Sequence, residues 1–155
     1  MNYLYTTTIL FSALVLSRLA GLPENFTPLL ALAVFTPRLG TSLWLPVAVL
    51  AVTDLVLGVY TVMPVVYACM LLAAYLGSRI PNVYWAGASS MLVWHVLVNG
   101  AVVIAGPGFP PFSAEALMFD ARLFAGTMVF IALFDYLRSE VFKVADVFET
   151  ARKAG

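Results

Sequence analysis

Long apolar runs separated by short polar breaks dominate the pattern of positions along this chain. They do not show the narrow apolar stripe of soluble amphipathic helices, and most approach the roughly 20 residues that a membrane-spanning helix needs. The six runs are Tyr3–Leu19, Phe26–Phe35, Ser42–Val59, Met63–Leu76, Val83–Ile104 and Ala114–Phe134. The pattern predicts an all-α fold, a polytopic bundle of six transmembrane helices.

The second run, Phe26–Phe35, is the shortest and is bounded by Pro28 and Pro37. At about 1.5 Å per residue a helix of this length covers only about half of the hydrocarbon core. We therefore expect a short tilted span or a re-entrant half-helix. Either form places residues 25–28 against protein or a cavity, because non-helical backbone is not tolerated in contact with lipid.

The residues after the last run form a different pattern, with apolar positions at alternating spacings of four and three. These positions are Leu137, Val141, Val144, Phe148 and Ala151, and charged residues occupy the other faces. The spacing predicts an amphipathic helix over 137–155, following a transmembrane domain over 1–136. This helix either packs on its own bundle or in the headgroup layer, or it docks a partner subunit.

Composition supports lipid as the solvent and excludes several function classes. The chain is 63% hydrophobic and 10% charged, whereas soluble domains average about 25% charged residues. A net charge of zero provides no basic surface for nucleic acid. With one cysteine, one histidine and no phosphate-loop or nucleophile motif, the sequence predicts no enzyme, no metal site and no cofactor.

The basic residues predict the orientation, because cytoplasmic loops are enriched in Lys and Arg. The tail carries four basic residues, and Arg38 and Arg79 lie in two connections that would share its side, the cytoplasmic side of a bacterial inner membrane. Arg18 interrupts the region where a signal peptide would be cleaved, so we expect a retained first helix. Six spans place Arg18 outside and five place it inside, and the sequence leaves both open.

Ionisable and amide side chains inside the runs are the candidate functional groups, because they are costly in lipid. In the six-span topology they gather in the extracytoplasmic half, as a pocket for a small polar or aromatic molecule requires. The candidate ligand-binding residues are Asp54, His95, Asn99, Asp120 and Arg122.

Two other interpretations of these residues stay open. The carboxylates could pair with Arg18 and Arg122 simply to hold the bundle together. Alternatively, Asp54, His95 and Asp120 could form a proton path. Asp120 and Arg122 are two positions apart, so they point in different directions on a helix and do not pair with each other.

Three stretches carry a resemblance to known proteins. They are PENFTPLLALAVF (Pro23–Phe35), LPVAVLAVTDLVLGVY (Leu45–Tyr60) and the pair Val66-Tyr67. Together they resemble an uncharacterised family of small bacterial membrane proteins, which is similar to the S components of energy-coupling-factor transporters. In those subunits a proline-containing stretch opens a short second helix, and an acid followed by a small residue lies near the outer end of the third. Pro28, Asp54 and Gly58 would take these roles.

The resemblance implies a six-helix subunit that captures a vitamin-like solute from outside and is then toppled by an ATP-driven partner module. The chain differs from S components in two features. The small residues Ala13 and Ser17 lie late in the first run rather than near its start, and the tail is long. The alternative function is an accessory subunit of a larger respiratory or photosynthetic membrane complex, with other membrane subunits as partners. A proton-coupled carrier would be a third class, but the chain lacks the internal repeat of many carriers.

Overall fold

The computed structural model describes residue 12, residues 26–106 and residues 113–154, and the described chain is all-α. The predicted first span, Tyr3–Leu19, lies outside the described residues apart from Ser12, and so do Arg18 and Asn25. The described residues form five helical segments. They are α2 (Leu29–Phe35) with the 3-10 turn η1 (Thr36–Leu39), α3 (Leu45–Leu57), α4 (Met63–Arg79), the continuous rod α5 (Val83–Trp94), η2 (His95–Asn99) and α6 (Gly100–Ala105), and α7 (Ala114–Ala154).

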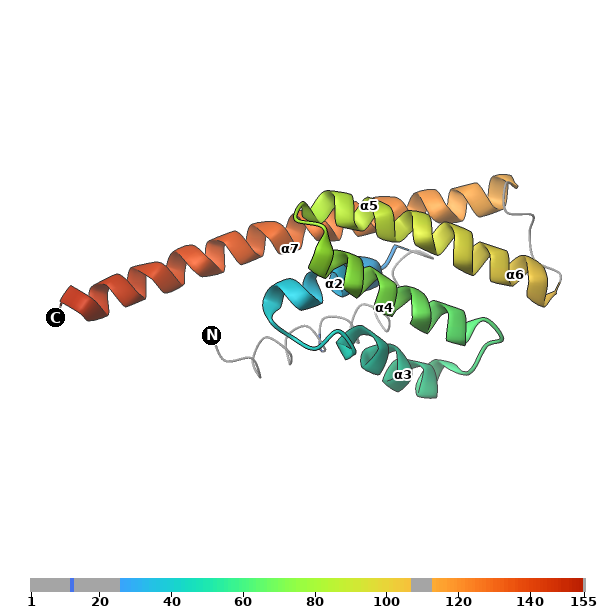
Figure 1. Cartoon of the computed structure of the whole chain (residues 1–155), viewed down its shortest axis with the longest axis horizontal. Helices are drawn as coiled ribbons and strands as arrows, with labels where there is room; N and C mark the ends of the chain where they lie inside the picture. The colour runs from blue at the N-terminus through green and yellow to red at the C-terminus, as the bar shows by residue number, and fades with distance from the viewer. Residues whose placement is uncertain (1–11, 13–25, 107–112, 155) are drawn as a thin grey trace.

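The rod α5–η2–α6 and the helix α7 form an antiparallel pair, with α2 and α4 beside them and α3 on the outer side of α4 (Figure 1). The side chain of Asn82 fixes where the rod begins, since its Oδ1 accepts hydrogen bonds from the amides of Tyr84 at 2.9 Å and Trp85 at 3.1 Å. Ser113 caps α7 in the same way, accepting from the Ala116 amide at 3.2 Å.

The prediction of six spanning helices is wrong for this structure. Among the described residues, two helices are long and apolar enough to cross a membrane, Val83–Ala105 and Ala114–Ser139. The helices from the other described runs are shorter, because the chain breaks them. Gly58 ends α3 with a left-handed φ of 104°, which favours glycine, and Pro46 sits in the first turn of the same helix.

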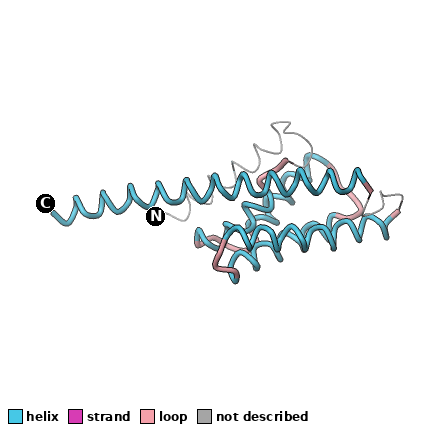
Figure 2. The backbone as a smooth tube through the Cα atoms, turned by 90° about the horizontal axis from the view of Figure 1, so that it is seen from above, coloured by secondary structure: helices cyan, strands magenta, loops and turns pink. Residues whose placement is uncertain are grey.

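The tail predicted as a helix over 137–155 is helical as far as residue 154, and it continues the last apolar run without a break. The residues 114–154 form one helix of 41 residues, so the expected boundary between 136 and 137 falls inside α7. The sequence between the two predicted elements contains no glycine or proline that would end a helix. As a result α7 projects well beyond the other described helices, as the tube in Figure 2 makes clear.

The short helix α2 forms the centre of the bundle rather than a lipid-facing span. Its residues Leu30 to Phe35 are all buried, and it packs against α3, α4, α5 and α7. Gly77 of α4 makes the closest approach, because a Cβ placed there would lie 2.2 Å from the carbonyl oxygen of Val34. Small residues that let helix backbones meet in this way are typical of packing between membrane helices.

Large apolar side chains cover the outside of the bundle. Leu55 on α3, Trp85 on α5 and Ile104 on α6 are 85%, 69% and 89% exposed. Only 17% and 22% of the apolar stretches in the two long helices are buried, whereas a core helix of a soluble protein is mostly buried. Exposed apolar surface on several helices indicates that the protein associates with a membrane.

The contact at Gly77 yields the first prediction. Replacing Gly77 with Ala should lower the free energy of unfolding in mixed micelles by about 1–3 kcal/mol or more, since the added methyl meets the backbone of α2. The matched control is Gly100→Ala, where a Cβ meets nothing within 4 Å and the residue is helical. That variant should be neutral or slightly stabilised. Equal loss of stability in both variants would contradict the close packing of α2 on α4.

Candidate functional site

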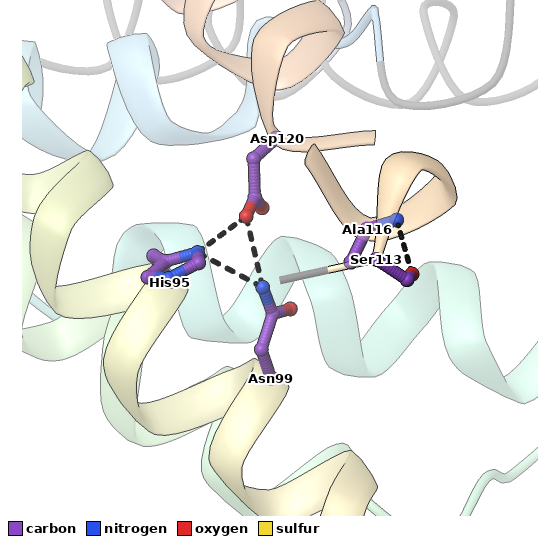
Figure 3. A network of polar contacts seen from close by, with 5 residues as sticks. All are labelled: His95, Asn99, Ser113, Ala116 and Asp120. Carbon is purple, nitrogen blue, oxygen red and sulfur yellow. Dashed lines mark hydrogen bonds and ion pairs between the residues drawn. The ribbon is translucent and has the colours of Figure 1, made fainter. Parts of the chain in front are cut away.

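Three of the five predicted site residues come together between η2 and α7. Asp120 of α7 faces His95 and Asn99 of η2, and all three side chains point toward one another (Figure 3). The Asn99 amide donates to Asp120 Oδ2 at 2.9 Å, and His95 Nδ1 makes a short contact with the same oxygen. We call these three residues the carboxylate cluster.

The chemistry of the acceptor assigns the proton in this cluster. With Asp120 taken as ionised, its carboxylate only accepts hydrogen bonds, and we assign the hydrogen to Nδ1 of His95. The Asn99 amide, 3.1 Å from that nitrogen, therefore donates to Asp120 and not to the ring. One oxygen, Oδ2, thus receives both bonds. The other, Oδ1, is buried and accepts no hydrogen bond in the described part of the chain.

A local change of helix type coincides with the cluster. His95 to Asn99 form a π-helical segment between the regular helices α5 and α6. Such segments are rare and are frequent at functional sites, because the wider turn re-aims side chains at a cost in helix packing. Here it places His95 and Asn99 on the side of the rod that meets α7.

Asp54 lies in a second polar contact, apart from the carboxylate cluster. It is 2% exposed near the end of α3 and accepts a hydrogen bond of 3.0 Å from the hydroxyl of Tyr67 on α4. This bond joins two of the three sequence stretches that carry the resemblance. Gly58, which the resemblance pairs with Asp54, lies just beyond the end of α3, and its amide donates to the Asp54 carbonyl at 2.8 Å.

Arg122 does not join either polar contact among the described residues. Its side chain is exposed on α7, whereas Asp120, two positions earlier, is 9% exposed. In the described part of the chain the side chain of Asp120 contacts His95 and Asn99 rather than an arginine. Pairing of Asp54 or Asp120 with Arg18 lies outside the described residues.

A cavity of about 340 Å³ lies between the α3–α4 pair and the α5–α7 pair. Its wall is mostly aliphatic and aromatic, with few polar groups. The lining residues are Thr27, Leu29, Leu30, Leu50, Tyr60, Val62, Val66, Met70, Trp94, Val98, Val102, Phe119 and Leu123. An apolar wall with a few polar groups is the usual composition of a small-molecule site.

None of the five residues of the two polar contacts lines this cavity, but several are sequence neighbours of residues that do. Trp94 and Val98 line it on the rod and are the immediate neighbours of His95 and Asn99, while Phe119 precedes Asp120. On the other side, Val66 precedes Tyr67. The α3–α4 connection and the end of α6 lie at the same end of the bundle, away from the C-terminus (Figure 1). Both contacts therefore lie in the half near that end.

The sequence offers Trp94 as a stacking or interfacial aromatic group, but the predicted ligand-binding residues do not include it. Its ring lines the cavity, the residue is 9% exposed, and its indole Nε1 has no hydrogen-bond partner in the described structure. Tyr67 was also not predicted as the donor to Asp54. The only sequence signal for Trp94 is its position next to the single histidine, which does not fix the direction of the indole.

Comparisons with known proteins add a family and no chemistry. A family model described as a family of unknown function (DUF6580) matches residues 1–142. No curated protein matches the chain. No solved structure matches it either.

The carboxylate cluster predicts energetic coupling between α7 and the rod. A double-mutant cycle of His95→Ala and Asp120→Ala should give a coupling free energy of about 1–3 kcal/mol, because each single change leaves a buried polar partner behind. The control cycle pairs His95→Ala with Ser78→Ala, an exposed residue near the end of α4 whose hydroxyl bonds locally to Tyr75. It should give under about 0.5 kcal/mol. Additive effects of His95 and Asp120 would contradict the cluster.

Proposed function

Because the chain belongs to the DUF6580 family, whose description assigns no activity, we propose a function from the geometry: a membrane-embedded solute-binding subunit. It captures a small molecule from the extracytoplasmic side in the cavity between α3–α4 and α5–α7. The observation that carries this proposal is the cavity of about 340 Å³ with its mostly apolar wall. It is at the lower end of the range for ligand pockets, which suits a small solute.

The orientation that we propose follows from the basic residues at the other end of the bundle. Arg38 donates to the carbonyl of Pro81 at 2.9 Å and to that of Ile80, which ties two connections together there. Burial, and then the positive charge of Arg138, lower the pKa of Arg38, while Asp135 opposes this, so α7 contributes charge to the same end. With the positive-inside rule, this end and the C-terminus are cytoplasmic, in a bacterial inner membrane.

In this arrangement the ligand would enter between the α3–α4 connection and the end of α6. The rod α5–α6 and the first part of α7 would cross the bilayer as a hairpin. Asn99 and Asp120 each lie six residues from the ends of their helices at the hairpin turn, which is about 9 Å along the axis. A solute from outside would thus reach the cavity without crossing the full membrane. We include in this proposal the likeness to S components of energy-coupling-factor transporters, in which an ATP-driven module would be the partner.

A second candidate function rests on the length of α7. The helix continues far past the other described helices, and Arg122 is exposed on its apolar part. An arginine facing lipid is costly, so a partner subunit covering this face would relieve it. In that case the protein is an accessory subunit of a larger membrane complex, and the polar contacts hold the bundle together.

The binding proposal predicts that the protein carries a small molecule, and that a substitution which fills the cavity removes this molecule. Protein purified in mild detergent should carry a small molecule detectable by native mass spectrometry. Val98→Phe places a ring in the cavity and should remove that molecule, whereas Leu97→Phe, at an exposed neighbouring position, should retain it. A stoichiometric set of large partners, with no small molecule in either variant, would favour the accessory subunit and contradict the binding proposal.

The orientation predicts opposite results for two reporter fusions in a bacterial host. A reporter that is fluorescent only in the cytoplasm should be active at the C-terminus, because the basic end of the bundle stays inside. Alkaline phosphatase, which is active only outside, should be active when fused after Gly106, at the end of α6. The reverse pattern would place the cavity mouth on the cytoplasmic side.

A further inference from the structure

The wall of the cavity carries no charged side chain. The described residues that line it include no Asp, Glu, Lys, Arg or His, and most of the wall is apolar. The buried carboxylates close to it in sequence are engaged with other side chains instead. Asp120 contacts His95 and Asn99, and Asp54 accepts from Tyr67. The selectivity of the cavity must therefore come from its own wall and not from these two polar contacts.

The wall also offers few hydrogen bonds. Among the described lining residues, Thr27, Tyr60 and Trp94 are the ones whose side chains contain a nitrogen or oxygen atom. The Thr27 hydroxyl already accepts from the Leu29 amide at 3.5 Å, and the indole nitrogen of Trp94 is buried. A ligand in this cavity thus meets mainly carbon.

An ion would be disfavoured in such a site. A charged molecule that enters loses its hydration, and an opposite charge is needed to compensate for that loss. The described wall supplies none. A neutral apolar molecule has no such requirement, because removing its surface from water is itself favourable.

The side chains of the wall indicate the shape and size of the ligand. Rings from three parts of the chain line it, namely Tyr60 before α4, Trp94 in α5 and Phe119 in α7, together with the thioether of Met70. Aromatic rings and thioethers make favourable contacts with another ring. An apolar cavity of about 150 Å³ accepts benzene, so a cavity of about 340 Å³ has room for about 12–14 non-hydrogen atoms.

We propose that the cavity binds a neutral, largely apolar molecule that contains a ring, and that it rejects organic ions of the same size. The carboxylate cluster and the contact between Asp54 and Tyr67 then join helices and do not touch the ligand. This inference rests on the proposed function and names the substrate class of that site.

The test uses Trp94 as the reporter of the cavity. The chain has three tryptophans, and the other two, Trp44 and Trp85, are 65% and 69% exposed, so both can be replaced with Phe. Three probes with the same phenylalkyl body are titrated at pH 7 in mild detergent. They are 6-phenylhexan-1-ol, which is neutral, 6-phenylhexylammonium and 6-phenylhexanoate. Free concentrations are corrected for partitioning of each probe into the micelles.

The alcohol should change Trp94 fluorescence saturably, with an affinity about tenfold or more above that of either ion. Val98→Phe in the same background fills the cavity and should abolish the saturable response. Leu97→Phe, at a neighbouring position that is 40% exposed, is the matched control and should retain it. The comparison of the three probes on the protein with Val98 intact stands even where the Phe variant does not fold.

The outcomes separate this inference from the proposed function. An affinity for the ammonium or the carboxylate that equals or exceeds that of the alcohol overturns the neutral class and leaves solute binding standing. A co-purifying molecule that is charged at pH 7 does the same, whereas a neutral one supports the class. A saturable response that persists in folded Val98→Phe places the alcohol outside the cavity and overturns the inference. No saturable response to any probe, together with no co-purifying small molecule, overturns the proposed function itself.

Discussion

The polar chemistry of this bundle depends on how one buried carboxylate is satisfied. Asp120 is buried on α7, and the bonds from His95 and Asn99 hold one of its oxygens against the rod α5–α6. An isolated charge at this depth would be strongly unfavourable, so the cluster fixes how the two long helices face each other. The second oxygen is buried and accepts no hydrogen bond in the described part of the chain.

The space beside this cluster exists because a short helix occupies the centre of the bundle. The helix α2 has only seven residues and meets α4 at Gly77. The closely packed part of the core therefore extends over only a short length of the bundle axis. Phe26, which precedes α2, and Phe35, its last residue, contact Phe130 and Phe134 of α7 with ring centroids 5.7 and 5.8 Å apart. The cavity follows where α2 begins, with Thr27 and Leu30 in its wall. A dense core and a hollow site therefore adjoin along one helix.

Helix positions could be predicted from the sequence better than the number of spans. Met63, Val83 and Ala114 are the first residues of both the predicted runs and the observed helices, because proline, asparagine and serine mark those boundaries. Hydropathy counts apolar residues and does not detect where Gly58 ends the backbone helix, so the run over 42–59 gave too long a helix. His95 and Asn99 are four residues apart, a spacing that puts both on one face of a helix. Their contact with Asp120 and the separation of Asp54 depend on helix rotation, which a single sequence does not contain.

The single histidine allows the most direct test of this account. Nitrogen-15 NMR of protein labelled only in histidine reports His95 alone, since the chain has no other imidazole. We expect a protonated Nδ1 with the signal of a strong hydrogen bond to a carboxylate, and a clear shift of this signal in Asp120→Asn. A signal like that of a free imidazole in water, unchanged by the substitution, would show that Asp120 and His95 do not meet and would contradict the site.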